Sequence, residues 1–248
     1  MWPPCLLAFL LSILRFTHEL EPPCRDLVCV ELFSGVGSIM TGMYKAGHPA
    51  VGFDKSYYTD DTEDITSPRG FSRAVGLVLR IRRGGSLWAA PVCSSWGFVG
   101  RSTTGRHAWS PEGCRFNHRV LNANSMVVIV TVLFMLAYTR GVHCWLEQPT
   151  TTLMSSFTPM CEWIEFAMPH RQLVYLGAYG SATQKALYVW CTSPIVTLLE
   201  RSKPLGKRTL CRNTKGKCTG KKTALSASSA YPQAFGDAVV ELMVVLLR

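Results

Sequence analysis

Two residues with reactive side chains each follow an apolar run that has the composition of a buried strand. Cys93 follows Ser86 to Ala90 in the stretch APVCSSWGF, and Glu147 follows Val142 to Leu146 in the stretch WLEQP. A cysteine thiolate is a nucleophile for covalent catalysis, and a placed carboxyl group can exchange a proton with a substrate. If both runs are strands of one parallel sheet, both side chains lie at its carboxyl edge, where such folds place their chemistry. The alternatives are a half-buried loop thiol for Cys93 and a structural carboxylate, bonded to local N–H groups, for Glu147.

A glycine-containing loop supplies a second candidate site. The stretch FSGVGS follows the β-rich apolar run Val28 to Phe33 and opens a helix. Glycines let the backbone approach a ligand, and a helix N-terminus offers free N–H groups, so this pattern favours a nucleotide-type ligand. Asp54 ends the neighbouring run, Ala50 to Phe53, where an acid can accept hydrogen bonds from ribose hydroxyls. The alternative for Asp54 is a plain helix cap.

The elements that must position these residues alternate along the chain, which predicts an α/β sheet with helices on both faces. The expected parallel strands are Val28 to Phe33, Ala50 to Phe53, Ser86 to Ala90 and Val142 to Leu146, and an edge hairpin joins Gln172 to Leu176 with Lys185 to Cys191 through Gly180. The first expected helix ends at about Ala46, and the others cover 66–83, 126–138, 158–167 and 225–247. Gly84 and Gly85 are expected to stop the helix over 66–83.

The length of 248 residues and the hydrophobic content of 48% predict a single domain with a short appendage. We assign residues 25–248 to the domain and residues 1–24 to an apolar N-terminal segment. The run Cys5 to Leu14 has the length of a signal-peptide core, but no Lys or Arg precedes it and no small-residue cleavage site follows. We expect a helix that packs on the domain, with a signal or a membrane anchor as the alternative.

The formal net charge of +10 favours a polyanionic partner, nucleic acid first and an anionic membrane surface second. Most of the excess lies between Arg201 and Lys222, a segment without an acidic residue, and a solvated basic loop with no partner is the alternative. The ten cysteines have no repeated spacing, which favours a reducing compartment, the nucleus or the cytoplasm. Because Cys211 and Cys218 have no second pair nearby, we expect no metal site.

These motifs stand in the order found in DNA cytosine-5 methyltransferases, and the chain resembles that family from Val28 to its C-terminus. ELFSGVGS resembles the family's cofactor-binding Phe-x-Gly-x-Gly loop, GFDK its second motif and EDIT its third. PVCSSWGF is similar to the Pro-Pro-Cys motif, and WLEQP to the Glu-Asn-Val or Glu-Asn-Pro motif. YGSATQKALYVWC resembles the Gly-x-Pro-Gln-x-Arg-x-Arg motif, and AYPQAFGDAVVEL resembles the closing Gln-x-x-Gly-Asn-Ala/Ser-Val helix.

The resemblance implies the class I methyltransferase fold, a Rossmann-like, mostly parallel and doubly wound sheet with an antiparallel edge hairpin. It also implies S-adenosylmethionine as the cofactor. Asp64 would face the adenine, and Asp61 competes with it for that role. The residues that the resemblance places at the cofactor are Phe33, Ser34, Gly35, Gly37, Ser38, Asp54, Lys55, Asp64 and Pro91.

For the chemistry, the resemblance implies methyl transfer to carbon 5 of a cytosine in nucleic acid. Cys93 would add to ring carbon 6, and Glu147 would donate a proton to ring nitrogen 3. The thiol then needs a lowered pKa, which we expect nearby positive charge or backbone N–H groups of its loop to provide. The target base must be flipped from a duplex or already single-stranded. The alternatives are a methyltransferase that acts on a different substrate and a nucleic-acid-binding relative that has lost catalysis.

The sequence departs from the family at residues that would contact nucleic acid. Val92 replaces the second proline, Lys185-Ala186-Leu187 replaces the Arg-x-Arg pair, and the basic segment 201–224 replaces a target-recognition domain. We therefore expect no counterpart of the arginine that helps hold the base, and a segment that holds phosphates without choosing a sequence. The candidate contacts are Arg101, Arg106, Gln184, Lys207, Arg208 and Arg212, in a monomer that binds DNA rather than RNA and has no membrane contact.

Overall fold

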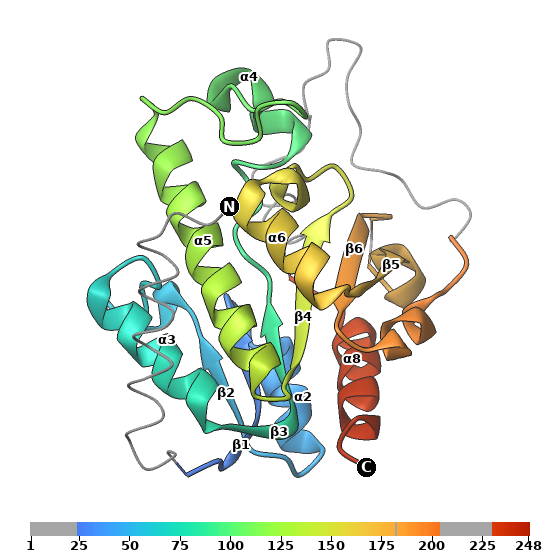
Figure 1. Cartoon of the computed structure of the whole chain (residues 1–248). Helices are drawn as coiled ribbons and strands as arrows, with labels where there is room; N and C mark the ends of the chain where they lie inside the picture. Colours follow the sequence, from blue (N-terminus) through green and yellow to red (C-terminus); the bar gives the residue numbers. More distant parts are fainter. Residues whose placement is uncertain (1–23, 182, 204–229) are drawn as a thin grey trace.

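The computed structural model describes residues 24–181, 183–203 and 230–248 (Figure 1). Its centre is a six-stranded sheet with the strand order β2-β1-β3-β4-β6-β5. The strands are β1 (Leu27–Leu32), β2 (Ala50–Phe53), β3 (Ile81–Ala89), β4 (His143–Pro149), β5 (His170–Tyr175) and β6 (Ala186–Cys191). Strands β1 to β4 are parallel, whereas β6 is antiparallel to both of its neighbours, β4 and β5. The fold is α/β, with a mostly parallel sheet and an antiparallel edge pair, and it is compatible with a Rossmann-like architecture.

Helices cover both faces of this sheet (Figure 1). They are α2 (Ser38–Lys45), α3 (Pro68–Arg80), α4 (Arg101–Thr104), α5 (His118–Thr139), α6 (Thr158–Ala167) and α8 (Gln233–Val245). Short 3-10 helices lie at η1 (Lys55–Tyr57), η2 (Phe98–Gly100), η3 (Met154–Ser156), η4 (Leu176–Tyr179) and η5 (Pro194–Leu199). Helices α3, α5 and α6 share a core with one face, and α2 and α8 share a core with the other. Along β3, Leu87 and Ala89 enter the first core and Trp88 the second, as the two-residue period of a strand requires.

Helix α5 is the buried helix that the apolar run 126–138 predicts. It begins earlier than this run, because the side chain of Asn117 accepts the N–H of Arg119 and caps it. Val127 and Phe134 have no exposed surface. Among the residues that the structure describes, α5 is the one helix long and apolar enough to cross a membrane, but only by length and composition, a test that core helices of globular domains also pass.

Strand β3 differs from the expectation. The helix predicted over 66–83 ends at Arg80, and β3 begins at once and includes both glycines that were expected to stop the helix. These glycines instead lie where the pairing of β3 with β1 shifts register. A Cβ atom on Gly85 would lie 2.6 Å from the carbonyl oxygen of Val28. The close approach of the neighbouring backbone therefore explains the glycine.

The antiparallel edge determines where Glu147 lies. This residue is inside β4 rather than in a loop after the strand, and it is paired with Val189 of β6. The predicted hairpin is present as β5 and β6, with η4 and Gly180 in the connection. Lys185 immediately precedes β6. Because β6 pairs with β4, Lys185 lies beside the predicted site.

The two appended segments predicted from the sequence lie almost entirely outside the described residues. Of the N-terminal segment 1–24 the structure describes only Cys24, and of the basic segment 201–224 it describes only residues 201–203. The final helix, expected over 225–247, is described as α8 from Gln233 onward.

Candidate functional site

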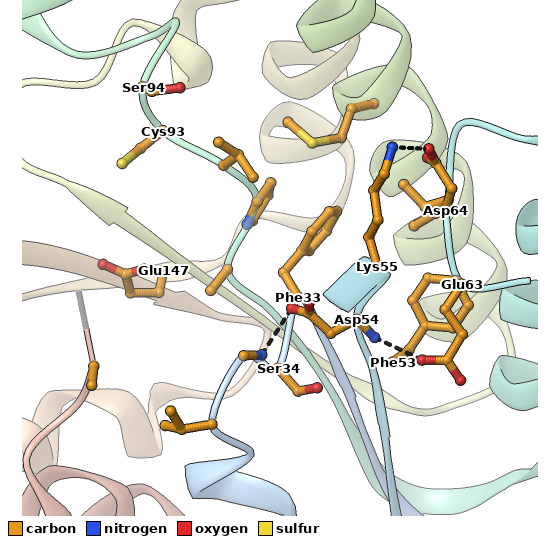
Figure 2. Close-up of a pocket in the computed structure, with 18 of the residues that line it drawn as sticks. Phe33, Ser34, Phe53, Asp54, Lys55, Glu63, Asp64, Cys93, Ser94 and Glu147 are labelled. Carbon is orange, nitrogen blue, oxygen red and sulfur yellow. Dashed lines mark hydrogen bonds and ion pairs between the residues drawn. The ribbon is translucent and has the colours of Figure 1, made fainter. Parts of the chain in front are cut away.

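A cavity of about 570 Å³ lies at the carboxyl edge of the parallel strands (Figure 2). Its wall includes Phe33, Ser34 and Gly35 after β1, Asp54 and Lys55 after β2, Pro91 and Cys93 after β3, and Glu147 in β4. In Figure 2, Cys93 and Glu147 lie on one side of Phe33, and Asp54 and Asp64 lie on the other. The structure thus brings the two residues with reactive side chains and most of the expected cofactor residues to one cavity.

The glycine loop follows β1 as a sharp turn in which Phe33, Gly35 and Gly37 have positive φ angles of 59°, 52° and 67°. The N–H of Gly35 donates to Oδ2 of Asp54 at 2.8 Å, which joins the loops after β1 and β2 at the cavity wall. A Cβ atom on Gly35 would meet nothing within 4 Å, so its backbone conformation, not its neighbours, favours glycine here.

Two expected cofactor residues do not line this cavity. Gly37 is the N-cap of α2, and Ser38 is the first residue of that helix. The Ser38 Cβ would lie 3.4 Å from a Cβ on Gly236 of α8, so Ser38 packs between the two helices instead of facing a ligand.

Glu31, in β1, binds the start of α2 behind the glycine loop, a role that the sequence interpretation missed. Its buried carboxylate accepts the N–H of Met40 at 2.8 Å and that of Ile39 at 3.4 Å, in the first turn of α2. Burial raises the pKa of Glu31 to about 7. The expectation of free N–H groups at this helix N-terminus is wrong for these two, because a carboxylate already binds them. The signal was an acid inside a buried apolar strand, where a charged group requires a partner.

Acidic side chains form the wall of the cavity beyond Phe33. The carboxylate of Asp54 accepts the N–H of Ser56 at 2.8 Å and its hydroxyl at 2.6 Å, in addition to the N–H of Gly35. The backbone N–H of Asp54 donates to the buried Glu63 at 2.9 Å, and Arg73 pairs with Glu63 at 3.0 Å. Asp54 is therefore held on both its backbone and its side chain.

Asp64, not Asp61, lies at the cavity. Its carboxylate accepts hydrogen bonds from Lys55 and from the hydroxyl of Thr66, the latter at 2.6 Å. Partial burial raises the pKa of Asp64, but the bonds from Lys55 and Thr66 outweigh burial and hold the pKa below its usual value. Asp61 is exposed and lies 3.8 Å from Arg69 at the surface.

The thiol of Cys93 is half-buried, and its surroundings do not activate it. Burial raises the pKa of Cys93, and the charge of Glu147 raises it further. The charge of Lys185 and a backbone hydrogen bond lower this pKa, but by less. The expectation of a net lowered thiol pKa is therefore wrong for the protein without bound ligands.

Glu147 is buried, with 7% of its surface exposed. Its Oε2 accepts the hydroxyl of Tyr231 at 3.0 Å, whereas Oε1 has no hydrogen-bond partner among the described residues. Burial raises the pKa of Glu147, and the charge of Lys185 and the bond from Tyr231 only partly oppose it. An unpartnered oxygen on a buried carboxyl group that favours its proton is suited to donate a hydrogen bond or a proton to a ligand.

Lys185 brings a positive charge to the cavity, and the sequence interpretation did not assign it to the site. This lysine lines the same cavity as Cys93 and Glu147, and its positive charge lowers the pKa of both. The signal for it was a cation at the start of a predicted strand, but its proximity to Glu147 follows only from the β4–β6 pairing.

Gln148 fixes the loop that carries Cys93. Its buried side-chain amide donates to the carbonyl oxygen of Pro91 at 2.7 Å, and its own oxygen accepts the hydroxyl of Thr152 at 3.2 Å. The N–H groups of Trp96 and Gly97 both donate to the Cys93 carbonyl oxygen at 2.9 Å. The backbone around the thiol is therefore held from both sides.

The expected nucleic-acid contacts divide into three cases. Arg106 was expected to bind phosphate, but it has no exposed surface and lies 3.4 Å from the centre of the Trp96 ring, so it cannot reach a phosphate in this structure. Arg101 is partly exposed and donates to the Thr151 carbonyl oxygen at 3.4 Å. Gln184 is half-buried beside Lys185. The remaining candidates lie outside the described residues: Lys207, Arg208 and Arg212.

No protein-family model matches this sequence, and no curated protein is significantly similar to it. Within residues 24–181, 183–203 and 230–248, no group of three His, Cys, Asp or Glu side chains is arranged to hold a metal ion. The case for a function therefore depends on the chemistry of the cavity.

Proposed function

We propose that this protein is an S-adenosylmethionine-dependent methyltransferase that transfers a methyl group to carbon 5 of a cytosine in nucleic acid. The observation that carries the proposal is one cavity that holds Cys93 and the unpartnered oxygen of buried Glu147 at one end and the glycine loop with Asp54 and Asp64 at the other. A nucleophile, a proton donor and a nucleotide-type subsite are the groups that this reaction requires.

The charges of the cavity support a cofactor without phosphate. S-adenosylmethionine carries an adenine, a ribose and a cationic sulfonium, and a volume of about 570 Å³ is ordinary for a small-molecule site. Glu31 occupies the helix N-terminus that would otherwise attract a pyrophosphate. Oδ2 of Asp54 accepts one hydrogen bond from Gly35 and has a second lone pair for a ribose hydroxyl. Phe33 and Ile65 supply apolar surface for the adenine.

The proposed reaction uses Cys93 as the nucleophile and Glu147 as the proton donor. When bound, the cofactor supplies an electrophilic methyl group. The Cys93 thiolate adds to carbon 6 while the carboxyl group of Glu147 donates a proton to ring nitrogen 3, which makes an electron pair available at carbon 5. After carbon 5 has gained the methyl group, a solvent water or hydroxide accepts the proton of carbon 5, and that electron pair forms the carbon 5–carbon 6 double bond as the Cys93–carbon 6 bond breaks. The proton on nitrogen 3 returns to Glu147.

The protonation state of Glu147 connects these two roles. A protonated Glu147 is the form that donates to nitrogen 3, and it is also the form without the negative charge that raises the pKa of Cys93. Burial of Glu147 therefore favours both the proton donor and the thiolate, with Lys185 beside them. Protonation of Glu147 thus removes the second cause of the raised pKa of Cys93, although burial, the first, remains.

A covalent trap tests the proposal. A cytosine with fluorine at carbon 5 cannot lose that substituent, so with S-adenosylmethionine the adduct to Cys93 should persist after denaturation. We expect the adduct with wild type and with Cys114→Ala, which removes an exposed loop thiol, but not with Cys93→Ala. Glu147→Gln should slow its formation by about 10²–10⁴-fold, the usual contribution of a placed acid or base. No adduct on any single- or double-stranded oligonucleotide would refute the proposal.

A second candidate is a binding-only relative that has lost catalysis. Val92 in place of a proline, Lys185 in place of an arginine and the raised pKa of the Cys93 thiol favour it. It predicts that calorimetry detects S-adenosylmethionine binding, weakened by Asp54→Ala, without methyl transfer to any polynucleotide. A methyltransferase on a different substrate would instead consume the cofactor with no adduct to Cys93.

A further inference from the structure

Three large aromatic side chains are exposed between the Cys93 loop and α5. Trp109 is 85% exposed, Phe116 86% and Phe98 48%. Every other tryptophan in the described part of the chain is buried, so the exposure of Trp109 is not explained by a need to fill a core. We define the aromatic–basic surface as Phe98, Trp109 and Phe116 together with Arg101, Arg115 and Arg119.

Each of these rings has a planar nitrogen-containing partner. The segment 98–119 contains a single acidic residue, Glu112, and among the described residues no ion pair neutralises its exposed arginines. The surface therefore combines aromatic faces with positive charge. Arg101 lies 5.2 Å from the centre of the Phe98 ring, and Arg115 lies 5.3 Å from that of Phe116. The ring of His107 stacks on that of Trp109, with the ring centres 5.1 Å apart and the planes 7° from parallel.

Buried Arg106 holds this segment in place. Its guanidinium donates to the carbonyl oxygens of Pro111 and Val120 and, at 2.8 Å, to the side chain of Asn124 in α5. The N–H of Cys114 donates to the Thr104 carbonyl oxygen at 2.8 Å. The exposed rings are therefore carried by a clamped backbone, which lowers the entropic cost of ordering them on a ligand.

One residue of the aromatic–basic surface, Arg119, lies next to the candidate site. A second cavity of about 410 Å³ is lined by Thr103 and Arg119 from this segment and by Lys55, Thr66 and Met126, which also line the main cavity. In Figure 1, α4 lies beyond the carboxyl ends of the parallel strands. A ligand that contacts Arg119 would therefore lie beside the candidate site.

We propose that the aromatic–basic surface binds a single-stranded polynucleotide and presents it to the cavity. In a duplex the base faces are already stacked on each other, whereas a single strand exposes them to aromatic side chains and leaves its phosphates to arginines. An unpaired target base also avoids the energetic cost of base flipping. This inference rests on the proposed function for the reaction at Cys93, but strand binding itself does not require that reaction.

Fluorescence anisotropy of the full chain with labelled single-stranded DNA, single-stranded RNA and duplex DNA of one sequence tests this inference. We expect both single strands to bind more tightly than the duplex, with the two arms deciding between DNA and RNA. Trp109→Ala and Phe116→Ala should each weaken single-strand binding by about 5- to 150-fold, the range for loss of one base–aromatic stack. Phe166→Ala, which removes a 52% exposed aromatic elsewhere, is the matched control and should change nothing.

The outcomes separate this inference from the proposed function. Three results would overturn the single-strand surface even if methyl transfer is observed. These are tighter binding of the duplex, an equal effect of Phe166→Ala, and a stronger effect of Trp109→Ala on binding to anionic vesicles than on binding to strands. Arg115→Ala and Arg119→Ala should each reduce the salt dependence of strand binding by about one phosphate contact. Strand binding that depends on Trp109 without any adduct to Cys93 would support the surface and refute methyl transfer to cytosine through Cys93.

Discussion

Replacing Tyr231 with phenylalanine removes one hydroxyl and keeps a ring that packs against Trp88 and Phe235, with ring centres 6.0 and 5.2 Å away. The hydroxyl donates to Oε2 of Glu147 at 3.0 Å. A hydrogen bond to an ionised group contributes about 1.5–3 kcal/mol, and one between neutral groups about 1 kcal/mol. The bond thus favours ionised Glu147 by about 0.5–2 kcal/mol, and Tyr231→Phe removes that preference.

The assay is the pH dependence of adduct formation with the 5-fluorocytosine oligonucleotide under single-turnover conditions. Because the active form combines the Cys93 thiolate with protonated Glu147, the rate should rise and then fall as pH rises, and in Tyr231→Phe the falling limb should move upward by about one pH unit. Tyr179→Phe is the matched control, since the buried Tyr179 hydroxyl donates to the Leu199 carbonyl oxygen at 2.7 Å and not to Glu147. An unchanged profile, a downward shift, or an equal shift in Tyr179→Phe would refute the reasoning.

Two further predictions concern stability. The folded pKa of Glu31 is raised to about 7 from 4.5, so its stabilising contribution is complete below about pH 4.5 and is lost as pH rises through about 7. Between these two pH values the free energy of unfolding of wild type should fall by about 3 kcal/mol from this group, and Glu31→Gln should abolish that fall in urea unfolding. An equal pH dependence of stability in both proteins would contradict this prediction. In α3, a Cβ on Gly70 would lie 2.0 Å from the Asp64 carbonyl oxygen, whereas one on Gly76 would meet nothing within 4 Å. Gly70→Ala should lower the free energy of unfolding by at least about 2 kcal/mol, and Gly76→Ala should raise it by about 0.5–1 kcal/mol. If both substitutions changed it in the same direction, the predicted difference between the two glycines would be wrong.

The elements that depend on local composition could be predicted from the sequence. Strand β2 and helix α6 have the predicted bounds, because each is a short apolar segment between clear breakers. The proximity of Cys93 and Glu147 followed from their places at the ends of apolar runs, since parallel strands bring such ends to one edge.

The features that the sequence did not reveal depend on partners far along the chain. The sequence predicts a helix stop at Gly85, because nothing local shows that the carbonyl oxygen of Val28 lies 2.6 Å from its Cβ position. The sequence predicts that Arg106 binds phosphate, because basic residues in a glycine-rich loop are usually exposed, yet Arg106 bonds to Asn124 and packs against the Trp96 ring. The charge of Lys185 reaches the site only through the antiparallel pairing of β6 with β4.

Lys185 acts on Cys93 and Glu147 in opposite senses for the proposed reaction. Its charge favours the Cys93 thiolate, which is the nucleophile, but it also favours ionised Glu147, which cannot donate a proton. Burial opposes the second effect, because Glu147 is 7% exposed and desolvation raises its pKa. A substrate nitrogen that accepted the hydrogen bond of Glu147 would further favour the protonated carboxyl group and so remove the negative charge that raises the pKa of Cys93. A base in the cavity would thus help to create the nucleophile that attacks it.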